Sequence, residues 1–274
     1  MKLDVLIPTY SRPAALAVTL AGLCAQRFRP FRVIVSDQTE GGASIRSGEA
    51  RAVSRVLERH GCEVRLLEHL PRRGIAEQRQ FLLECSSAPY VLYLDDDVLL
   101  EPYVLGLMLD VIERERCAFV GSSVIGLSFV NDVRPSQQHV ELWDGPVRPE
   151  VVVPGSREWA RSKLHSAANL YHVQRRLGAT PDAPLRYKIA WASACVLYDA
   201  AKLREIGGFS FWRRLPAEHC GEDVVPQLEL MSRYGGCGIM PSGAYHLELP
   251  TTITRREVGA ERVLGWGRTE AREA

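Results

Sequence analysis

The sequence carries almost no net charge, few lysines and no long apolar run. Its 34 Lys and Arg residues against 33 Asp and Glu residues give a formal net charge of +1. Without an overall positive field the chain does not recruit nucleic acid or an anionic membrane by charge alone, so any anion site must be local. No stretch reaches the ~18 apolar residues that a membrane span needs, and the N-terminal apolar run is interrupted by Asp4 and Pro8. We therefore expect a soluble, unexported chain.

Cysteine usage excludes a disulfide scaffold and a zinc site. The seven cysteines are an odd number and form no C-x-x-C pair or zinc-ligand spacing. Most of them lie in apolar runs, where reduced core thiols are expected. Together with the absence of an export signal, this pattern favours a cytoplasmic location.

The composition is that of an ordinary folded protein of 274 residues, with 46% hydrophobic and 24% charged residues. The first half alternates β-branched apolar runs with amphipathic segments, which predicts a βαβ series and a mostly parallel sheet. Ser11 is the expected N-cap of the first helix, with Pro13 in its first turn. The predicted strands are 3–7, 31–36, 62–67 and 90–94, and further helices are predicted at 48–60 and 74–85.

The second half is less regular. Residues 131–186 are rich in proline and scattered histidines and predict an irregular insertion or lid. Regular structure is expected again at 187–198, after which Asp199 caps a short helix that ends at two glycines. A helix at 223–234 and a closing strand at 237–247 follow, and 251–274 forms a charged C-terminal tail. The simplest organisation is one compact domain with a decorated second half.

Three consecutive acids, Asp95, Asp96 and Asp97, follow the strand predicted at 90–94. Adjacent carboxylates repel one another, and a hard divalent cation such as Mg²⁺ or Mn²⁺ shared with substrate phosphates relieves that repulsion. If the backbone stays extended, Asp95 and Asp97 point the same way. The alternative is capping of the next predicted helix. Capping accounts for one or two acids rather than three, so we predict metal binding.

Arginines stand just before the helix predicted at 74–85. Arg72 and Arg73 oppose the dipole of that helix unless an anion such as a diphosphate lies between the guanidinium groups and the free N–H groups. Arg79 is a second candidate for anion contact. The alternative is that these are solvated loop residues, at a cost of a few tenths of a kcal/mol.

A second pair of acids, Glu222 and Asp223, follows Gly221 at the start of the helix predicted at 223–234. A carboxylate at this position can act as a general base close to an incoming hydroxyl. It can equally be the N-cap of its own helix, and spacing alone favours that interpretation for Asp223.

Three further residues near predicted strand ends have two interpretations each. His246 is either a metal or phosphate ligand or a structural histidine. Trp191 and Ser193 stand where a strand meets a loop, and they are candidates for contact with a sugar ring. Core packing accounts equally well for Trp191.

Six segments in this order resemble family 2 glycosyltransferases with the GT-A fold: D-V-L-I-P-T-Y-S-R-P, V-I-V-S-D-Q-T, R-R-G-I-A-E-Q-R-Q, Y-L-D-D-D-V, I-A-W-A-S-A-C-V-L-Y-D-A-A-K-L-R-E-I-G-G-F and G-E-D-V. The resemblance covers 1–130 well and 187–248 moderately. It implies a Rossmann-like α/β fold with flanking helices around a mostly parallel sheet. Residues 1–130 would then be the nucleotide-sugar-binding half, and 187–250 the acceptor-binding and catalytic-base half.

The resemblance also implies roles for single residues. The nucleotide sugar would be bound by Pro8, Thr9, Tyr10, Arg12, Asp37, Arg73, Gly74, Arg79, Asp95 and Asp96. Among these, Asp37 would recognise the base or ribose, and Gly74 and Arg79 would flank the diphosphate. Asp97, with Asp95 and His246, would hold Mn²⁺ or Mg²⁺. Asp223, in preference to Glu222, would be the catalytic base, and Trp191 and Ser193 would contact the acceptor.

The resemblance predicts an inverting, metal-dependent, non-processive glycosyltransferase. Its partners would be a nucleotide diphosphate sugar and a small-molecule, glycan or peptide acceptor. The segment Ser36-Asp37-Gln38-Thr39 stands where the family has Asp-Asp-Gly-Ser, which leaves the donor base open. One alternative is a sugar nucleotidyltransferase, which usually has a glycine-rich loop after its first strand. The other is an inactive sugar-nucleotide or glycan-binding module.

Overall fold

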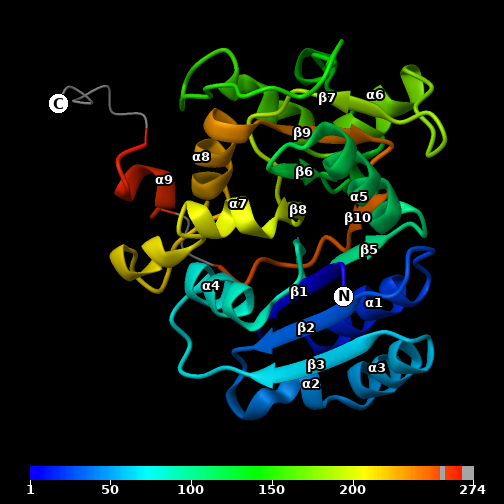
Figure 1. Cartoon of the computed structure of the whole chain (residues 1–274), viewed down its shortest axis with the longest axis vertical. Coiled ribbons are helices and arrows are strands. Elements are labelled where there is room, and N and C mark those ends of the chain that lie inside the picture. The colour runs from blue at the N-terminus through cyan, green and yellow to red at the C-terminus, as the bar shows by residue number, and fades with distance from the viewer. Residues whose placement is uncertain (254–256, 267–274) are drawn as a thin grey trace.

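The computed structural model describes residues 1–253 and 257–266. Their largest feature is an eight-stranded sheet with the order β3-β2-β1-β4-β8-β6-β9-β7, which runs from the bottom to the top of Figure 1. β1 pairs in parallel with β2 and β4, β2 with β3, and β6 with β9, whereas β8 and β7 run against their neighbours. The predicted α/β fold with a mostly parallel sheet is confirmed.

The elements within the described residues have the following bounds. The strands are β1 Leu3–Thr9, β2 Arg32–Asp37, β3 Glu63–Glu68, β4 Tyr90–Leu94, β5 Val98–Leu100, β6 Phe119–Gly121, β7 Leu185–Tyr187, β8 Cys195–Asp199, β9 Gly236–Met240 and β10 Ala244–His246. The α-helices are α1 Pro13–Cys24, α2 Ala43–Arg46, α3 Gly48–Arg59, α4 Ile75–Cys85, α5 Val104–Glu115, α6 Asn169–Arg176, α7 Ala200–Glu205, α8 Val224–Tyr234 and α9 Ala260–Val263.

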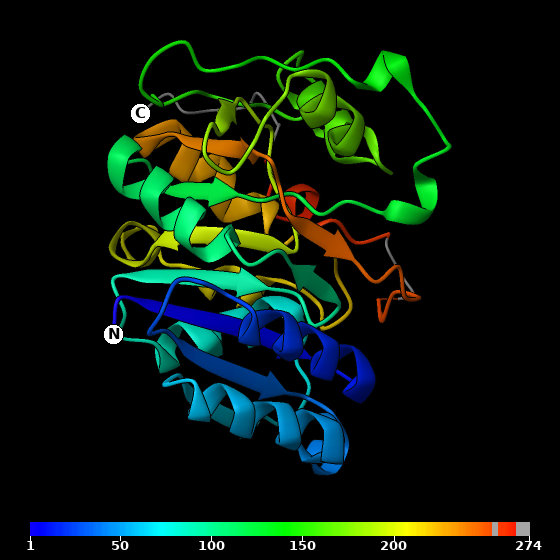
Figure 2. The same ribbon diagram turned by 90° about the vertical axis from the view of Figure 1, so that its right-hand side faces the viewer.

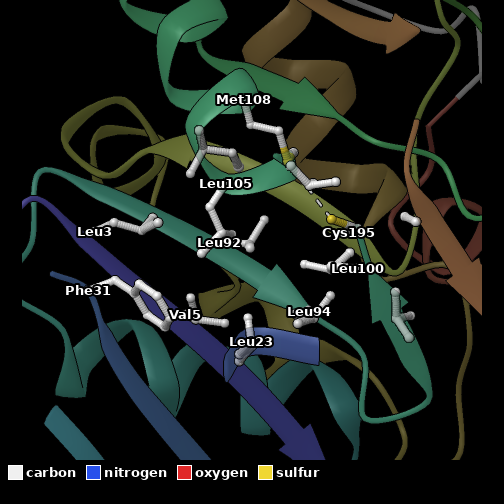
Figure 3. Packing of buried hydrophobic residues seen from close by; sticks show 14 of the residues in the cluster. Leu3, Val5, Leu23, Phe31, Leu92, Leu94, Leu100, Leu105, Met108 and Cys195 are labelled. Atoms are coloured by element: carbon white, nitrogen blue, oxygen red, sulfur yellow. Dashed lines mark hydrogen bonds between the residues drawn. The ribbon is translucent and has the colours of Figure 1, made fainter. Parts of the chain in front are cut away.

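Alternating side chains of the central strands build two cores. Leu3, Val5 and Ile7 of β1 belong to the core under α1, α3 and α5, which Figure 3 shows in part, whereas Leu6 belongs to the core under α4, α7 and α8. This is the two-residue period of a strand buried on both faces. Figure 2 shows α1, α3 and α5 together on one face of the sheet. Each fully buried leucine stabilises the fold by roughly 1.5–3 kcal/mol.

A second, two-stranded sheet stands beside the carboxyl end of β4. β5 pairs antiparallel with β10, and this pairing sets Val98 opposite His246. The Val98 N–H donates to Thr19 Oγ1 (3.1 Å), which fixes the chain just after the acidic triplet to α1. The late histidine and the acids are therefore brought together by strand pairing.

The structure departs from the predicted elements in three places. The strand predicted at 237–247 is divided by Pro241, Ser242 and Gly243 into β9 and β10, which belong to different sheets. The regular stretch predicted at 187–198 is divided by a loop between β7 and β8. Ser11 has a positive φ of 56°, and Arg12 precedes α1 in its place, without a side-chain capping bond.

The predicted insertion is more regular than expected. It contains α6 and 3-10 turns, including Trp159–His165. Val152, Leu164 and Leu170 pack into the core under α4, α7 and α8. Asp199 is the N-cap of α7 as predicted, since its Oδ1 accepts from the N–H groups of Ala201 and Lys202. Of the predicted tail, residues 254–256 and 267–274 lie outside the described residues.

Within the described part of the chain, the helices are all too short or too polar to cross a membrane.

Candidate functional site

A cavity of about 290 Å³ opens at the carboxyl ends of β1 and β4. Ligand sites of parallel sheets are expected at this position. The walls come from the loop after β1, from α4, from the acidic triplet, from β10 and from the segment after β10. The lining residues are Pro8, Thr9, Tyr10, Arg12, Ile75, Gln78, Arg79, Asp95, Asp96, Asp97, Glu222, His246, Leu249, Thr251, Thr252 and Ile253.

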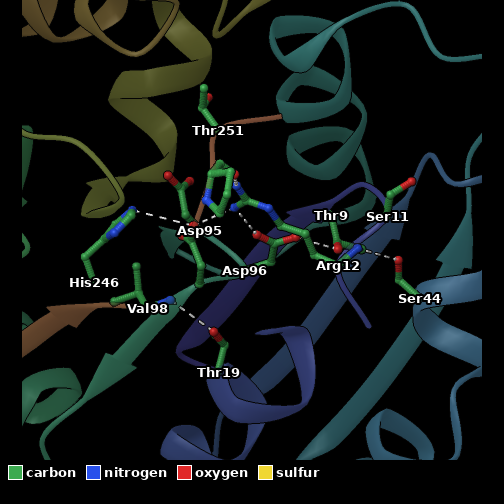
Figure 4. A network of polar contacts seen from close by, with 12 residues as sticks. Thr9, Ser11, Arg12, Thr19, Ser44, Asp95, Asp96, Val98, His246 and Thr251 are labelled. Atoms are coloured by element: carbon green, nitrogen blue, oxygen red, sulfur yellow. Dashed lines mark hydrogen bonds and ion pairs between the residues drawn. The ribbon is translucent and has the colours of Figure 1, made fainter. Parts of the chain in front are cut away.

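The acidic triplet turns instead of staying extended, so the prediction that Asp95 and Asp97 point the same way is wrong. Asp96 and Asp97 share Arg12, whose Nη1 lies 3.3 Å from Asp96 Oδ1 and 2.5 Å from Asp97 Oδ2 (Figure 4). Asp96 Oδ2 also accepts from the Thr9 hydroxyl (2.6 Å). Arg12 is therefore the counter-charge of two of the three acids.

Burial raises the pKa of two acids in this cluster. Desolvation raises the pKa of Asp96 to about 7, against the Thr9 hydrogen bond, which lowers it. Desolvation and the charge of Asp95 likewise raise the pKa of Asp97, against His246 and Arg12, which lower it. A cation placed here finds carboxyl groups whose charge is incompletely balanced by Arg12.

Arg79 is almost fully buried and lies between two other carboxylates. Its Nε donates to Glu222 Oε1 (2.9 Å), and its Nη2 donates to Asp95 Oδ1 (3.1 Å). Burial works to lower the pKa of Arg79, but the surrounding carboxylates outweigh it, and the net pKa is raised. Arg79 thus stays charged and connects α4, the acidic triplet and the start of α8.

The two acids before α8 have different surroundings. Glu222 is 5% exposed, lines the cavity and is bonded to Arg79. Asp223 stands at the N-cap position of α8, as spacing favoured, but its side chain makes no capping hydrogen bond, and it is not among the residues that line the cavity. Desolvation and the charge of Glu222 raise the pKa of Asp223 to about 7, while Arg79 works to lower it. A carboxyl group with this pKa can take up a proton near neutral pH.

Asp97 and His246 are the protein groups best placed to hold a divalent cation. Asp97 Oδ2 lies 3.5 Å from His246 Nε2, and His246 Nδ1 accepts from the N–H of Glu248 (2.8 Å), which fixes the ring. Asp95 instead faces Arg79. The described residues contain no group of three or more such ligands, so a cation at Asp97 and His246 would need further oxygen ligands from outside the protein.

Several predicted site residues lie away from this cavity. Asp37 is fully buried, and its carboxylate accepts from the N–H groups of Thr39, Ser44 and Ile45. Trp191 packs on Trp159 of the insertion, with ring centroids 4.2 Å apart.

Ser193 and Arg73 are exposed and do not line this cavity.

The N-terminus of α4 is also not the open anion site that Arg72 and Arg73 indicated. His219 Nε2 accepts from the Ala76 N–H (3.2 Å) and so caps the helix. A Cβ at Gly74 would lie 2.5 Å from the Ala217 carbonyl oxygen, so glycine is needed for this close approach. Gly74 therefore allows the close approach of the Ala217 carbonyl to the start of α4.

Sequence reasoning missed Gln78, Gln38 and the segment 249–253 as site residues. Gln78 Nε2 donates to the carbonyl oxygens of Ser36 (2.7 Å) and Thr9 (3.2 Å), which joins the ends of β1 and β2. Gln78 follows Ile75 by three residues on α4, so both lie on one helix face. This spacing is visible in the sequence and could have indicated that Gln78 belongs to the site. The segment 249–253 gave no such signal, although the Pro250 carbonyl accepts from Arg12.

Comparison with solved structures shows what this fold is similar to. S. aureus TarS 1-349 in complex with UDP-GlcNAc is 16% identical, with a TM-score of 0.59 over 92% of this chain and 60% of that one. The mannosyltransferase PcManGT from Pyrobaculum calidifontis, in complex with GDP-Man and Mn²⁺, is 16% identical, with a TM-score of 0.55 over 92% of this chain and 58% of that one. The chain thus spans less than two thirds of these proteins, and the predicted GT-A architecture is confirmed.

A comparison with curated proteins gave no match. The family model described as Glycosyl transferase family 2 matches residues 4–159. That match covers more than half of the sequence and includes the loop after β1, α4 and the acidic triplet. The chain therefore belongs to glycosyl transferase family 2.

Proposed function

We propose that the chain transfers a sugar from a nucleotide diphosphate sugar to an acceptor hydroxyl or another nucleophile, with inversion at the anomeric carbon. One observation carries this proposal. Four acids, two arginines and a histidine meet in a single cavity at the carboxyl ends of parallel strands. The family membership and the complexes of the similar structures with UDP-GlcNAc and with GDP-Man and Mn²⁺ support it.

The chemistry is a direct displacement. The acceptor oxygen forms a bond to the anomeric carbon while the bond from that carbon to the diphosphate oxygen breaks, and the electron pair leaves with the diphosphate. Stabilising this leaving charge is usually the largest contribution in such sites. A divalent cation held by Asp97 and His246 would supply Lewis-acid neutralisation of it. Arg12 is a further positive charge at the same wall.

Asp223 takes the proton of the acceptor. Its carboxyl group titrates near neutral pH, whereas Glu222 is bonded to Arg79. Glu222 and Asp95 hold the Arg79 guanidinium from two sides, which keeps the floor of the cavity rigid.

Thermal unfolding with a panel of nucleoside diphosphates, with and without Mn²⁺, tests this proposal. A ligand at 100 times its Kd stabilises the folded state by about 2.7 kcal/mol, so a metal-dependent rise in Tm is expected for at least one nucleotide. Asp97→Asn should lose the metal dependence. Asp110→Asn, an exposed acid on α5, should keep it. A panel without any stabilising nucleotide would contradict the proposal. Release of pyrophosphate from a nucleoside triphosphate in the presence of a sugar phosphate would instead indicate a nucleotidyltransferase.

A further inference from the structure

A second cavity of about 120 Å³ lies next to the first. The two share Tyr10, Ile75 and Gln78 and also the segment residues Thr252 and Ile253. The acidic triplet, Arg79 and His246 line only the first cavity. The residues found only in the second are Gln38, Arg72, Ala217, Glu218 and His219.

One wall of the second cavity is suited to a flat ring. The Arg72 guanidinium lies 3.9 Å from the centroid of the Tyr10 ring, so two planar groups are already stacked there. Ile75 adds an apolar surface. If the diphosphate and sugar occupy the first cavity, as the proposed function requires, the nucleobase reaches this adjoining space.

Gln38 is held in one orientation by two residues behind it. It is 3% exposed, and its Nε2 donates to Glu77 Oε2 (3.1 Å). Glu77 Oε1 accepts from His69 Nε2 (2.8 Å), and the His69 ring stacks on Phe81 with centroids 3.7 Å apart. A carboxylate only accepts hydrogen bonds, so Gln38 must present its NH₂ group to Glu77. Among the described residues no donor is bonded to the Gln38 amide oxygen, which is left for a ligand.

We propose that Gln38, oriented by Glu77 and His69, is a specificity-determining residue whose amide oxygen accepts a hydrogen bond from a ring N–H of the donor nucleobase. This inference rests on the proposed function and specifies its substrate class. Uracil and thymine carry such a ring N–H at N3 and guanine at N1. Cytosine and adenine have a bare acceptor nitrogen at the same positions, which would face the amide oxygen and repel it.

Binding constants for UDP, CDP, GDP and ADP in the presence of Mn²⁺ test the inference by calorimetry. The full chain should bind UDP more tightly than CDP, or GDP more tightly than ADP, by about tenfold or more, since a mismatched buried acceptor loses a hydrogen bond and leaves a polar group unpaired. Gln38→Leu should reduce this ratio to near one. Glu77→Gln allows the Gln38 amide to turn over, and it should reduce the ratio while the protein stays folded.

Glu84→Gln is the matched control. Glu84 lies on the same helix as Glu77 and accepts from the Gln80 amide (2.8 Å), but it lines neither cavity. This variant should keep the full ratio. An unchanged ratio in both Gln38→Leu and Glu77→Gln, or a preference of the unaltered protein for CDP and ADP, would overturn the inference while the proposed function stands. If none of the four nucleotides binds, both fail together.

Discussion

Glu222 and Asp223 are adjacent carboxylates in different electrostatic surroundings. The Arg79 Nε–H group is bonded to Glu222, whose negative charge in turn disfavours ionisation of Asp223. Desolvation acts in the same direction, and the pKa of Asp223 rises to about 7. The pair thus combines a fixed counter-ion for Arg79 with a group able to exchange a proton near neutral pH.

The pH dependence of transfer should report this raised pKa. Asp223 is protonated below about pH 7, so kcat/KM should fall about tenfold per pH unit below that value and reach a plateau above it. Asp223→Asn should lower kcat by about 10²- to 10⁴-fold and remove the acidic limb of the profile. Initial rates measured from pH 5 to 9 with a fixed donor provide the test.

The variant Glu222→Gln distinguishes the role of Glu222 from that of Asp223 in the same pH profile. It should lower activity by disturbing Arg79 but keep a pH-dependent acidic limb. An intact acidic limb in the pH profile of Asp223→Asn would assign the proton transfer to another group.

The stability of the fold should depend on pH in the opposite direction to the activity. Because the folded state raises the pKa of Asp223, its neutral form stabilises the fold fully below about pH 4, and this contribution is lost as the pH rises through 7.

Residue types at the site were predictable, but their pairing was not. A run of three acids after a buried strand and an arginine-rich helix start are visible in the sequence. In the structure Arg12 pairs with Asp96 and Asp97, whereas Asp95 faces Arg79. This pairing depends on a turn at the triplet, which the alternation of side chains along an extended strand does not predict. Asp37 fits a family motif, but its carboxylate accepts from the N–H group of Thr39 in its own loop and from those of Ser44 and Ile45 in α2.

At the scale of elements, the pairing of β5 with β10 positions His246. The two strands come from distant parts of the sequence, and their register sets His246 opposite Val98, next to Asp97. The Gly243 carbonyl accepts from the Glu101 N–H (2.7 Å) at the start of this pairing. β10 therefore depends on the backbone at Gly243.

Gly243→Ala should weaken both the fold and the cation site. Gly243 has a φ of 66°, and an added Cβ would lie 2.5 Å from Tyr103 Oη. The left-handed conformation costs about 1 kcal/mol for a residue with a Cβ, and the overlap adds about 1–3 kcal/mol. Urea denaturation should show this loss, and the Mn²⁺-dependent rise in Tm with nucleotide should shrink because β10 shifts.

Gly178→Ala isolates the backbone contribution. Gly178 has nearly the same φ of 65°, but no atom lies within 4 Å of an added Cβ. It should lose only about 1 kcal/mol and keep its response to Mn²⁺. Equal losses in the two variants would show that the contact with Tyr103 does not position β10.

Strands and helices were predictable where the hydrophobic pattern of the segment itself marks the element. β1, β2, β3 and β4 lie close to the predicted 3–7, 31–36, 62–67 and 90–94. Apolar runs mark β1, β2 and β4 as buried strands, whereas β3 is a partly exposed strand at the edge of the sheet. β5 was missed because it has only three residues. The division of 237–247 into two strands follows from pairing with different partners, which no local period reveals.

At the scale of the whole molecule, the predicted insertion is joined to the sheet at several points. The Lys188 N–H donates to the Glu141 carbonyl (2.8 Å), and the Glu150 N–H donates to the Met231 carbonyl (3.0 Å). Arg161 connects the insertion internally, with Nη2 3.0 Å from Glu141 Oε2 and Nη1 2.7 Å from Glu150 Oε2. These contacts favour unfolding of the insertion together with the sheet.

Arg161→Ala should therefore destabilise the molecule in one transition. The Arg161 side chain is 7% exposed, and its removal leaves two partly buried carboxylates without their main partner, at a cost of about 1–3 kcal/mol after allowance for solvent screening.

The Arg161 hydrogen bond lowers the pKa of Glu141, so this stabilisation is present above about pH 4.5 and is lost as the pH falls further. Urea denaturation at pH 7 and pH 4 measures the difference. Arg46→Ala, which removes an exposed pair with Glu68, should change stability by less than about 1 kcal/mol. A separate early transition in Arg161→Ala would show instead that the insertion unfolds independently as a lid.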